Sequence, residues 1–548
     1  MTRISNLVQI QSYTWGILIF LVSLIFILDP RYFTSPPLYS DDWLMISRYV
    51  FDGFNLADLV ERRPFLEAFF YTTFSIFGTK IQYFYLANFL ILFLSGILFT
   101  VIVKKAFPKF AWIPLLAALV YLIYPADYSK SWLIMSFIHF VLLIDLIVVL
   151  FLMAYAESGK IWYLLFANIL FLYTLGIYEA GLGLVMLAGL LLAILSRDIS
   201  INRRLSLLSV LVTGGFFIIW RTFIQPNILS VADNYLEHLN TSFGTILYRY
   251  ARGLFIFIFN WVGPWLNPFG KTKYLIFMAA GLIILGISLV FFPRLISRAK
   301  SSLTFPWEER KKQIKSFLPI LLIGVLFWAA GYFPVISYDL PAFNGIDSRF
   351  NLFSIAGASL AMVAGLACLS TLVVKTTEQI KIMTQIAVIP FLLAGGFYQL
   401  WSQNERFQAW EHQKQFWNLT FEIAPGLKNE SKVVIVIPGY QELDQFEPVP
   451  FSGNWEARSA LQVLYNNKNL NAQYYYPDIP HQGSNSLPGN EEWSKYMFLY
   501  YNPAKPSVEI MEEPVEALSL PGNLPGYEPG KRITQQSQQS GLYRWLVR

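Results

Sequence analysis

Long apolar runs alternate with short polar segments through residues 1–401 of the chain. A helical span needs about 20 apolar residues, and fewer where flanking Lys or Arg side chains reach the interface. On this basis the sequence predicts about eleven membrane-spanning helices. They fall near residues 13–28, 82–103, 110–124, 132–153, 161–176, 180–196, 205–224, 274–292, 317–335, 351–374 and 383–401.

The long apolar runs stop in the second part of the chain, residues 402–548, which contains Pro/Gly-rich stretches. Within it, residues 432–438 predict a buried strand that ends in a turn, residues 455–465 a helix and residues 472–476 a second strand. The predicted fold class is therefore an all-α polytopic membrane protein followed by a small α/β domain. The predicted domains are 1–401 and 402–548.

Composition supports this division. Apolar residues make up 55% of the chain and charged residues 14%, whereas soluble domains carry about 25% charged residues. Residues 1–401 carry a net charge of +10 and residues 402–548 one of −4. No stripe of Lys and Arg with interleaved aromatics occurs on a soluble surface, so the basic balance does not indicate nucleic-acid binding. The single cysteine, Cys368, excludes intrachain disulfides and Cys-based zinc sites.

Basic residues predict how the chain crosses the membrane. Short cytoplasmic loops are enriched in Lys and Arg, and residues 293–316 carry Arg294, Arg298, Lys300, Arg310, Lys311, Lys312 and Lys315. With this segment and the N-terminus inside, we expect a multi-pass plasma-membrane protein. An odd number of spans then places residues 402–548 outside the cell.

An acidic pair, Asp41 and Asp42, follows a Pro-Pro turn in the first outer segment and precedes a predicted short helix. Ser40 or Asp41 is suited to cap that helix, with the charges favoured by its dipole. A carboxylate at the membrane face is equally suited to act as general base on an acceptor hydroxyl. The pair is also suited to hold a divalent cation, Mg or Mn. No organic cofactor is indicated.

Other polar residues fall on the same predicted face. Asp127 lies in a second outer turn, Glu179 lies near the outer end of a span, and His139 lies in the fourth span. An unpaired charge within a span is costly and marks a candidate functional residue. The alternative is that Asp127 is a solvated turn residue and that the others complete hydrogen bonds between helices. Arg63 precedes a predicted interfacial helix at 65–77 and is suited to anchor it.

Three arginines are candidate anion ligands. Arg249 and Arg252 are three residues apart and share one face of a predicted helix. Such a pair suits a phosphate group. Arg349 stands directly before the tenth span, at its outer mouth. For each arginine the alternative is an anchor that reaches the membrane interface.

The order of these motifs resembles the GT-C class of membrane glycosyltransferases, nearest to the protein O-mannosyltransferases, the lipid A aminoarabinose transferases and the tetratricopeptide-bearing O-mannosyltransferases. The resemblance rests on Asp41-Asp42, Arg63-Pro64-Phe65, Tyr85-Leu-Ala-Asn88, Tyr124-Pro125, Tyr178-Glu179 and Asp347-Ser-Arg349-Phe. Tyr124, Tyr178 and Phe350 depart from the His, Lys and Tyr that are usual in those families. No tetratricopeptide repeat follows, so a protein acceptor does not carry over from that subfamily.

The resemblance implies an inverting, mannosyltransferase-like hexosyltransferase. Its donor would be a sugar on polyprenyl phosphate, and its acceptor a glycan, lipid or protein at the outer face. Asp41 would be the base, and Asp42 would orient it or assist with a metal. Asp127 would belong with the catalytic acids. The donor phosphate would be bound by Arg349, Arg249 and Arg252. Supporting roles would fall to Glu179, His139 and Arg63.

Two other functions compete with this one. A flippase for lipid-linked glycans, or another transporter, would also have many spans and arginines for lipid phosphate. It should place polar residues at both faces and at the midplane, whereas here they crowd the outer face. A non-catalytic scaffold that presents the tail domain would leave Asp41 and Arg349 dispensable.

Overall fold

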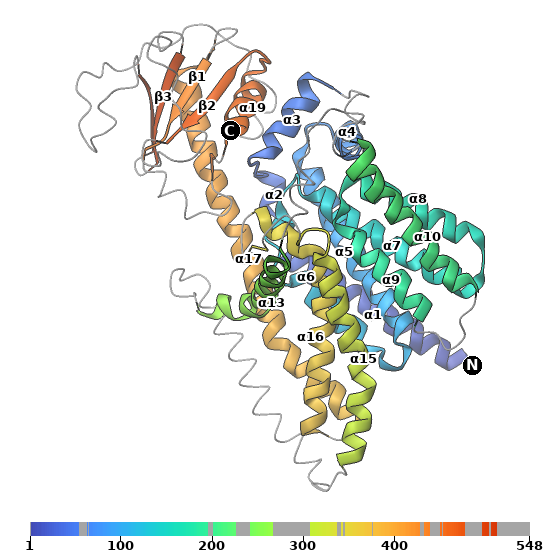
Figure 1. Cartoon of the computed structure of the whole chain (residues 1–548). Helices are drawn as coiled ribbons and strands as arrows, with labels where there is room; N and C mark the ends of the chain where they lie inside the picture. Colours follow the sequence, from blue (N-terminus) through green and yellow to red (C-terminus); the bar gives the residue numbers. More distant parts are fainter. Residues whose placement is uncertain are drawn as a thin grey trace.

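The computed structural model is mostly helical, with a small sheet near the C-terminus (Figure 1). The residues that it describes are 2–53, 63, 65–194, 201–225, 242–266, 307–336, 341–342, 346–374, 376–427, 432–438, 450–451, 453–476, 496–503 and 506–511.

The helices before the sheet pack as a bundle, with α3 and α4 at one end (Figure 1). They are α1 (Thr2–Phe26), α2 (Arg31–Thr34), α3 (Asp41–Phe51), α4 (Leu66–Phe77), α5 (Ile81–Ala106), α6 (Trp112–Ile123), α7 (Ser136–Ser158), α8 (Ile161–Ile177), α9 (Leu182–Ile194), α10 (Ile201–Ile219), α13 (Phe243–Leu266), α15 (Trp307–Tyr332), α16 (Leu352–Val373) and α17 (Thr377–Ile423). The helices predicted after Asp41-Asp42 and over 65–77 are confirmed as α3 and α4.

Among the described residues, six helices are long and apolar enough to cross a membrane. They are Ile81–Ala106, Ser136–Ser158, Arg204–Ile224, Trp307–Tyr332, Ser348–Val373 and Thr377–Ile423. Shorter apolar helices cover four more predicted spans, at Thr14–Phe26, Trp112–Ile123, Ile161–Ile177 and Glu179–Ile194. The span predicted at 274–292 lies outside the described residues. The total of eleven spans and the outer location of the tail stay predictions.

Helices α15 and α16 pack with their backbones in contact. A Cβ atom on Gly331 would lie 2.5 Å from the backbone of Phe353 and Ser354, and one on Gly357 would lie 2.1 Å from the amide nitrogen of Trp328. Small residues permit such close approach between membrane helices. The contact at Gly331 fixes the start of α16, which directly follows Arg349.

Helix α17 extends well beyond the predicted last span. Thr376 and Gln379 form a capping box at its start, with both bonds at 3.2 Å. The helix then continues for 47 residues, so the domain boundary predicted after residue 401 falls inside one continuous helix. Its second half is held by aromatic packing: Trp410 lies beside Trp43, and Phe416 beside Tyr501.

The C-terminal sheet has four strands in the order β2-β1-β3-β4. Strand β1 (Lys432–Val436) pairs in parallel with β2 (Asn471–Tyr475) and β3 (Tyr496–Asn502), and β4 (Ser507–Met511) pairs antiparallel with β3. The strands predicted at 432–438 and 472–476 are thereby confirmed.

Helix α19 (Asn454–Tyr465) connects β1 to β2 and confirms the helix predicted at 455–465. It packs on α3, where the Ser47 hydroxyl donates to Gln462 Oε1 at 3.0 Å. The sheet therefore lies at the end of the bundle that holds α3 (Figure 1), which we call the acid-pair end because Asp41 and Asp42 begin that helix.

Candidate functional site

The Asp42 side chain, rather than Ser40, organises the start of α3. Ser40 makes no side-chain capping hydrogen bond, so the predicted Ser40 cap is wrong. Instead the Asp42 carboxylate accepts the Tyr39 backbone N–H at 3.0 Å and the Ile134 backbone N–H at 2.8 Å. Ser40 has a φ of 43°, a value that is strained for a residue with a side chain. Asp42 thus joins two segments that are distant in sequence and holds a strained turn between them.

The two adjacent carboxylates have different surroundings. Asp42 is fully buried, and burial raises its pKa to about 7, although the amides of Tyr39 and Ile134 oppose this shift. Asp41 is half-buried. Burial raises its pKa too, against the opposing effects of Arg349, the Trp455 indole and Arg48, in that order.

Solvent can therefore reach Asp41, whereas both oxygens of Asp42 accept hydrogen bonds from the protein.

Arg349, whose charge lowers the pKa of Asp41, lies in a 3-10 turn, Ile346–Asn351, that precedes α16. Asn351 fixes this turn by donating to the carbonyl of Ala126 at 2.6 Å and to that of Ala342 at 2.9 Å. Ser348 Oγ in the same turn accepts the Tyr128 backbone N–H at 2.8 Å. Contacts between loops thus set the position of the turn that carries Arg349.

Arg63 and Glu179 lie beside the same site. The Arg63 guanidinium lies 3.9 Å from the Glu179 carboxylate and 4.8 Å from the centre of the Tyr178 ring. Burial raises the pKa of Tyr178 to about 12, and the charges of Arg63 and Arg349 oppose that shift. The structure thus places Arg63, Tyr178 and Arg349 in one cluster, with Glu179 balancing part of its positive charge.

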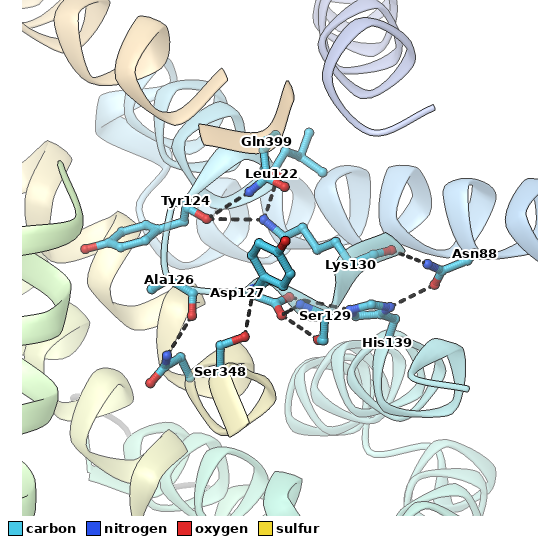
Figure 2. A network of polar contacts seen from close by, with 12 residues as sticks. Asn88, Leu122, Tyr124, Ala126, Asp127, Ser129, Lys130, His139, Ser348 and Gln399 are labelled. Atoms are coloured by element: carbon cyan, nitrogen blue, oxygen red, sulfur yellow. Dashed lines mark hydrogen bonds and ion pairs between the residues drawn. The ribbon is translucent and has the colours of Figure 1, made fainter. Parts of the chain in front are cut away.

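Asp127 is buried within the protein, contrary to the alternative of a solvated turn residue. One of its oxygens accepts from the Ser129 backbone N–H at 2.8 Å and from the Ser129 hydroxyl. The other faces His139 Nε2 at 3.5 Å (Figure 2). Burial opposes ionisation, but His139, Lys130 and Ser129 together lower the pKa of Asp127.

The rest of this buried network ties the Asp127 turn to α5 and α6 (Figure 2). The Asn88 amide nitrogen donates to the carbonyl of Lys130 at 2.5 Å, so the Asn88 Oδ1 atom is the one that faces His139. His139 Nδ1 therefore donates to Asn88 Oδ1, at 2.8 Å. The Lys130 ammonium donates to the Leu122 carbonyl at 2.8 Å. Burial lowers the pKa of Lys130 to about 8, and Asp127 opposes that shift. His139 and Asp127 therefore hold the shape of a turn that supports the acid pair.

Arg406, on α17, belongs to this site but was not among the predicted residues. Its fully buried guanidinium lies 4.4 Å from the centre of the Tyr128 ring and 5.5 Å from that of Trp132. The Tyr39 hydroxyl donates to its backbone carbonyl. A hydropathy pattern places Arg406 beyond the last span and gives no signal for it. Its aromatic partners, Tyr128 and Trp132, follow Asp127 closely in the sequence, but only the structure shows that they face a cation.

The predicted phosphate ligands Arg249 and Arg252 donate to backbone carbonyls of the described chain. Arg249 donates to Ile336 at 2.8 Å, and Arg252 donates through Nε to Pro341 at 2.8 Å. Both arginines therefore fasten the segment that leads to Arg349, and a phosphate role for them stays a prediction.

A divalent cation at the acid pair stays a prediction. Within the described ranges, no group of three or more His, Cys, Asp or Glu residues is arranged to hold a metal ion. Both oxygens of Asp42 already accept backbone N–H bonds, which leaves Asp41 as the accessible carboxylate of the pair.

A cavity of about 330 Å³ lies away from the acid pair. Its lining is mostly apolar and includes Phe99, Leu146 and Phe327, with Lys105 and Glu157 at one side. Lys105 is near the last residue of α5, whereas Tyr85, near the first, donates to the Pro37 carbonyl beside the acid pair. The cavity is therefore one helix length from the acid pair.

No protein-family model matches the chain, and no curated protein is significantly similar to it in sequence.

We predict that Asp42→Asn lowers the free energy of unfolding by about 1–3 kcal/mol, because the amide nitrogen cannot accept one of the two backbone N–H bonds. Asp41→Asn should leave stability nearly unchanged, since Asp41 is half-exposed. Thermal unfolding of the purified variants in detergent micelles compares the two. Equal destabilisation by both changes would contradict the structural role of Asp42.

Asp127 offers a second comparison. Asp127→Ala should destabilise the protein by about 1–3 kcal/mol, because it leaves buried Ser129 and His139 groups without their partner. Asp127→Asn should be much milder, since its oxygen still accepts from Ser129 and its amide can donate to His139 Nε2. Unfolding temperatures measure both effects. An Asp127→Asn protein that unfolds like Asp127→Ala would show that the negative charge itself is required.

Proposed function

We propose that the protein is an integral membrane glycosyltransferase that moves a sugar from a polyprenyl-phosphate donor to an acceptor hydroxyl, with inversion. The observation that carries this proposal is the half-buried Asp41 carboxylate at the acid-pair end, where the charge of Arg349 lowers its pKa. Such a transfer needs a base for the hydroxyl proton and a cation for the leaving phosphate.

In this mechanism the acceptor oxygen attacks the anomeric carbon while Asp41 takes its proton. The bond from that carbon to the phosphate oxygen breaks, and its electron pair leaves on polyprenyl phosphate. Arg349 neutralises the phosphate charge, and Arg63 adds positive potential nearby. A single displacement from the side opposite the phosphate inverts the anomeric configuration.

Asp41 is better suited than Asp42 to be the base. A general base works best when its pKa is close to the working pH, and burial raises the pKa of both carboxylates, so access to the acceptor decides between them. Asp42 has no access to substrate because it is fully buried. We therefore assign Asp42 a positioning role, in which it fixes the turn that presents Asp41.

The position of the basic helix ends supports placing this site at the outer face. Helix α15 starts with the basic residues Arg310, Lys311, Lys312 and Lys315, and its last turn packs on the start of α16 beside Arg349. The helix has 26 residues, a length of about 39 Å. Because basic residues favour the cytoplasmic side, the opposite end, with Asp41, Arg349 and the C-terminal domain, is assigned to the outer side.

The direct test is Asp41→Asn, assayed with purified protein in liposomes, a panel of polyprenyl-phosphate sugars and a cell-envelope acceptor extract. We expect transfer to fall by roughly 10²–10⁴-fold, the usual contribution of a general base. Asp52→Asn is the matched control, because Asp52 follows the same helix and is largely exposed. A variant at Asp41 that transfers sugar at the wild-type rate would overturn the assignment.

The charge of Arg349 should also be visible in the pH dependence of transfer. Arg349 lowers the pKa of Asp41, so Arg349→Ala should raise that pKa and move the acidic limb of kcat/KM to higher pH. Arg48→Ala should cause a smaller shift in the same direction, because Arg48 has the smaller effect on Asp41. A limb that stays in place, or moves to lower pH, in Arg349→Ala would contradict the Asp41–Arg349 coupling.

A further inference from the structure

We propose that Trp455 of the C-terminal domain is a platform on which the acceptor stacks, and that this acceptor is a carbohydrate. This inference rests on the proposed function, because it takes Asp41 as the base that receives the acceptor's proton. It adds to that function a substrate class and a residue that determines specificity.

Trp455 is joined to the acid pair through its indole nitrogen. It is the second residue of α19, and its indole N–H donates to Ser40 Oγ at 3.2 Å, next to Asp41. The same indole lowers the pKa of Asp41. The side chain is nevertheless 49% exposed. The polar edge of the ring is therefore bound to the protein while much of its apolar surface stays open to solvent.

The chain on both sides of Trp455 is held firmly in place. Phe451 is fully buried and packs against Phe416 and Tyr501. Asn454 Oδ1 accepts the Tyr474 backbone N–H at 2.8 Å. Single exposed aromatic side chains are common and need no functional explanation. Trp455 differs because its side chain is held in a fixed position beside a candidate base, and fixed geometry lowers the cost of binding a ligand.

Helix α17 holds the residue that follows Trp455 and connects it to the helix that begins with the acid pair. The neighbouring Glu456 accepts from the Gln413 amide at 2.9 Å, and Gln413 Oε1 accepts from the Trp43 indole at 3.4 Å, one residue after Asp42. The orientation of Trp455 is therefore coupled to the acid pair through protein contacts.

Gly453 provides the space that the indole occupies. A Cβ atom at this position would lie 2.6 Å from the Trp455 ring, which is closer than such atoms approach. The φ of Gly453 is −164°, an extended value that any residue adopts. Gly453→Ala therefore displaces the ring without straining the backbone and without changing any residue that contacts Asp41.

A sugar ring fits this combination of groups. It presents apolar C–H faces that pack on an aromatic ring, and hydroxyls at its edge that meet hydrogen-bonding groups. With one face on Trp455, an acceptor sugar would direct an edge hydroxyl toward the neighbouring Asp41 carboxylate. Because the base contacts the acceptor rather than the lipid-linked donor, stacking at Trp455 belongs to the acceptor side.

Binding can be tested without any transfer activity. The full chain is labelled with 5-fluorotryptophan in detergent micelles, and the Trp455 resonance is identified by its loss in Trp455→Phe. We expect soluble oligosaccharides to shift this resonance and Ser/Thr-containing peptides to leave it unchanged. A resonance that no saccharide shifts, or that only peptides shift, overturns the inference. A saccharide shift in a protein that transfers no sugar would refute the proposed function but keep the carbohydrate site.

Kinetics then test the specificity role. Trp455→Leu and Gly453→Ala should each raise the KM for the acceptor roughly tenfold and leave the KM for the donor unchanged, while Trp455→Phe should have an intermediate effect. Trp162→Leu is the matched control, because Trp162 is 67% exposed on α8 and should not affect either KM. An unchanged acceptor KM in both Trp455→Leu and Gly453→Ala would rule out the platform.

Discussion

The buried carboxylate of Asp42 is the constraint on which the rest of the site depends. It accepts backbone N–H groups from Tyr39 and from Ile134, which belong to two different loops. A buried carboxylate is tolerated only when its oxygens are hydrogen-bonded. Burial of Asp42 therefore requires both loops to lie beside its side chain. The strained φ of Ser40 is one consequence. The other is that Asp41, the preceding residue in the chain, remains partly exposed.

Fixed charges surround this constraint and are themselves held by the protein. The Arg406 guanidinium packs against the rings of Tyr128 and Trp132, and its charge lowers the pKa of Asp42. The Asp127–His139 contact sets the shape of the turn that carries Tyr128. A site whose charged groups are held by second contacts of this kind can act on substrate without reorganising.

Several elements of the fold could be predicted from the sequence because each has a strong local signal. Hydrophobic periodicity predicted the helix at 65–77, the strand at 432–438 and the helix at 455–465. The long extension of α17 could not be predicted in this way. Its second half is held by aromatic packing between protein surfaces, and a hydropathy window detects only burial in lipid.

The site could be predicted in part, for a related reason. Asp41 and Arg349 stood out because charges beside apolar spans are rare. Arg406 and Trp455 lie in polar stretches, where neither residue is unusual, and only tertiary contacts bring them to the acid pair. The burial of Asp127 likewise depends on contacts with His139 and Ser129. The local sequence around Asp127 does not show that His139 lies beside it.

The central claim is a single displacement in which Asp41 acts as base and no covalent sugar–enzyme intermediate forms. The stereochemistry of the product tests this claim most directly. Purified protein in liposomes is given a polyprenyl-phosphate sugar of known anomeric configuration, and the configuration of the product linkage is determined by NMR from its anomeric coupling constants. The account predicts complete inversion. A product that retains the donor's configuration would contradict it.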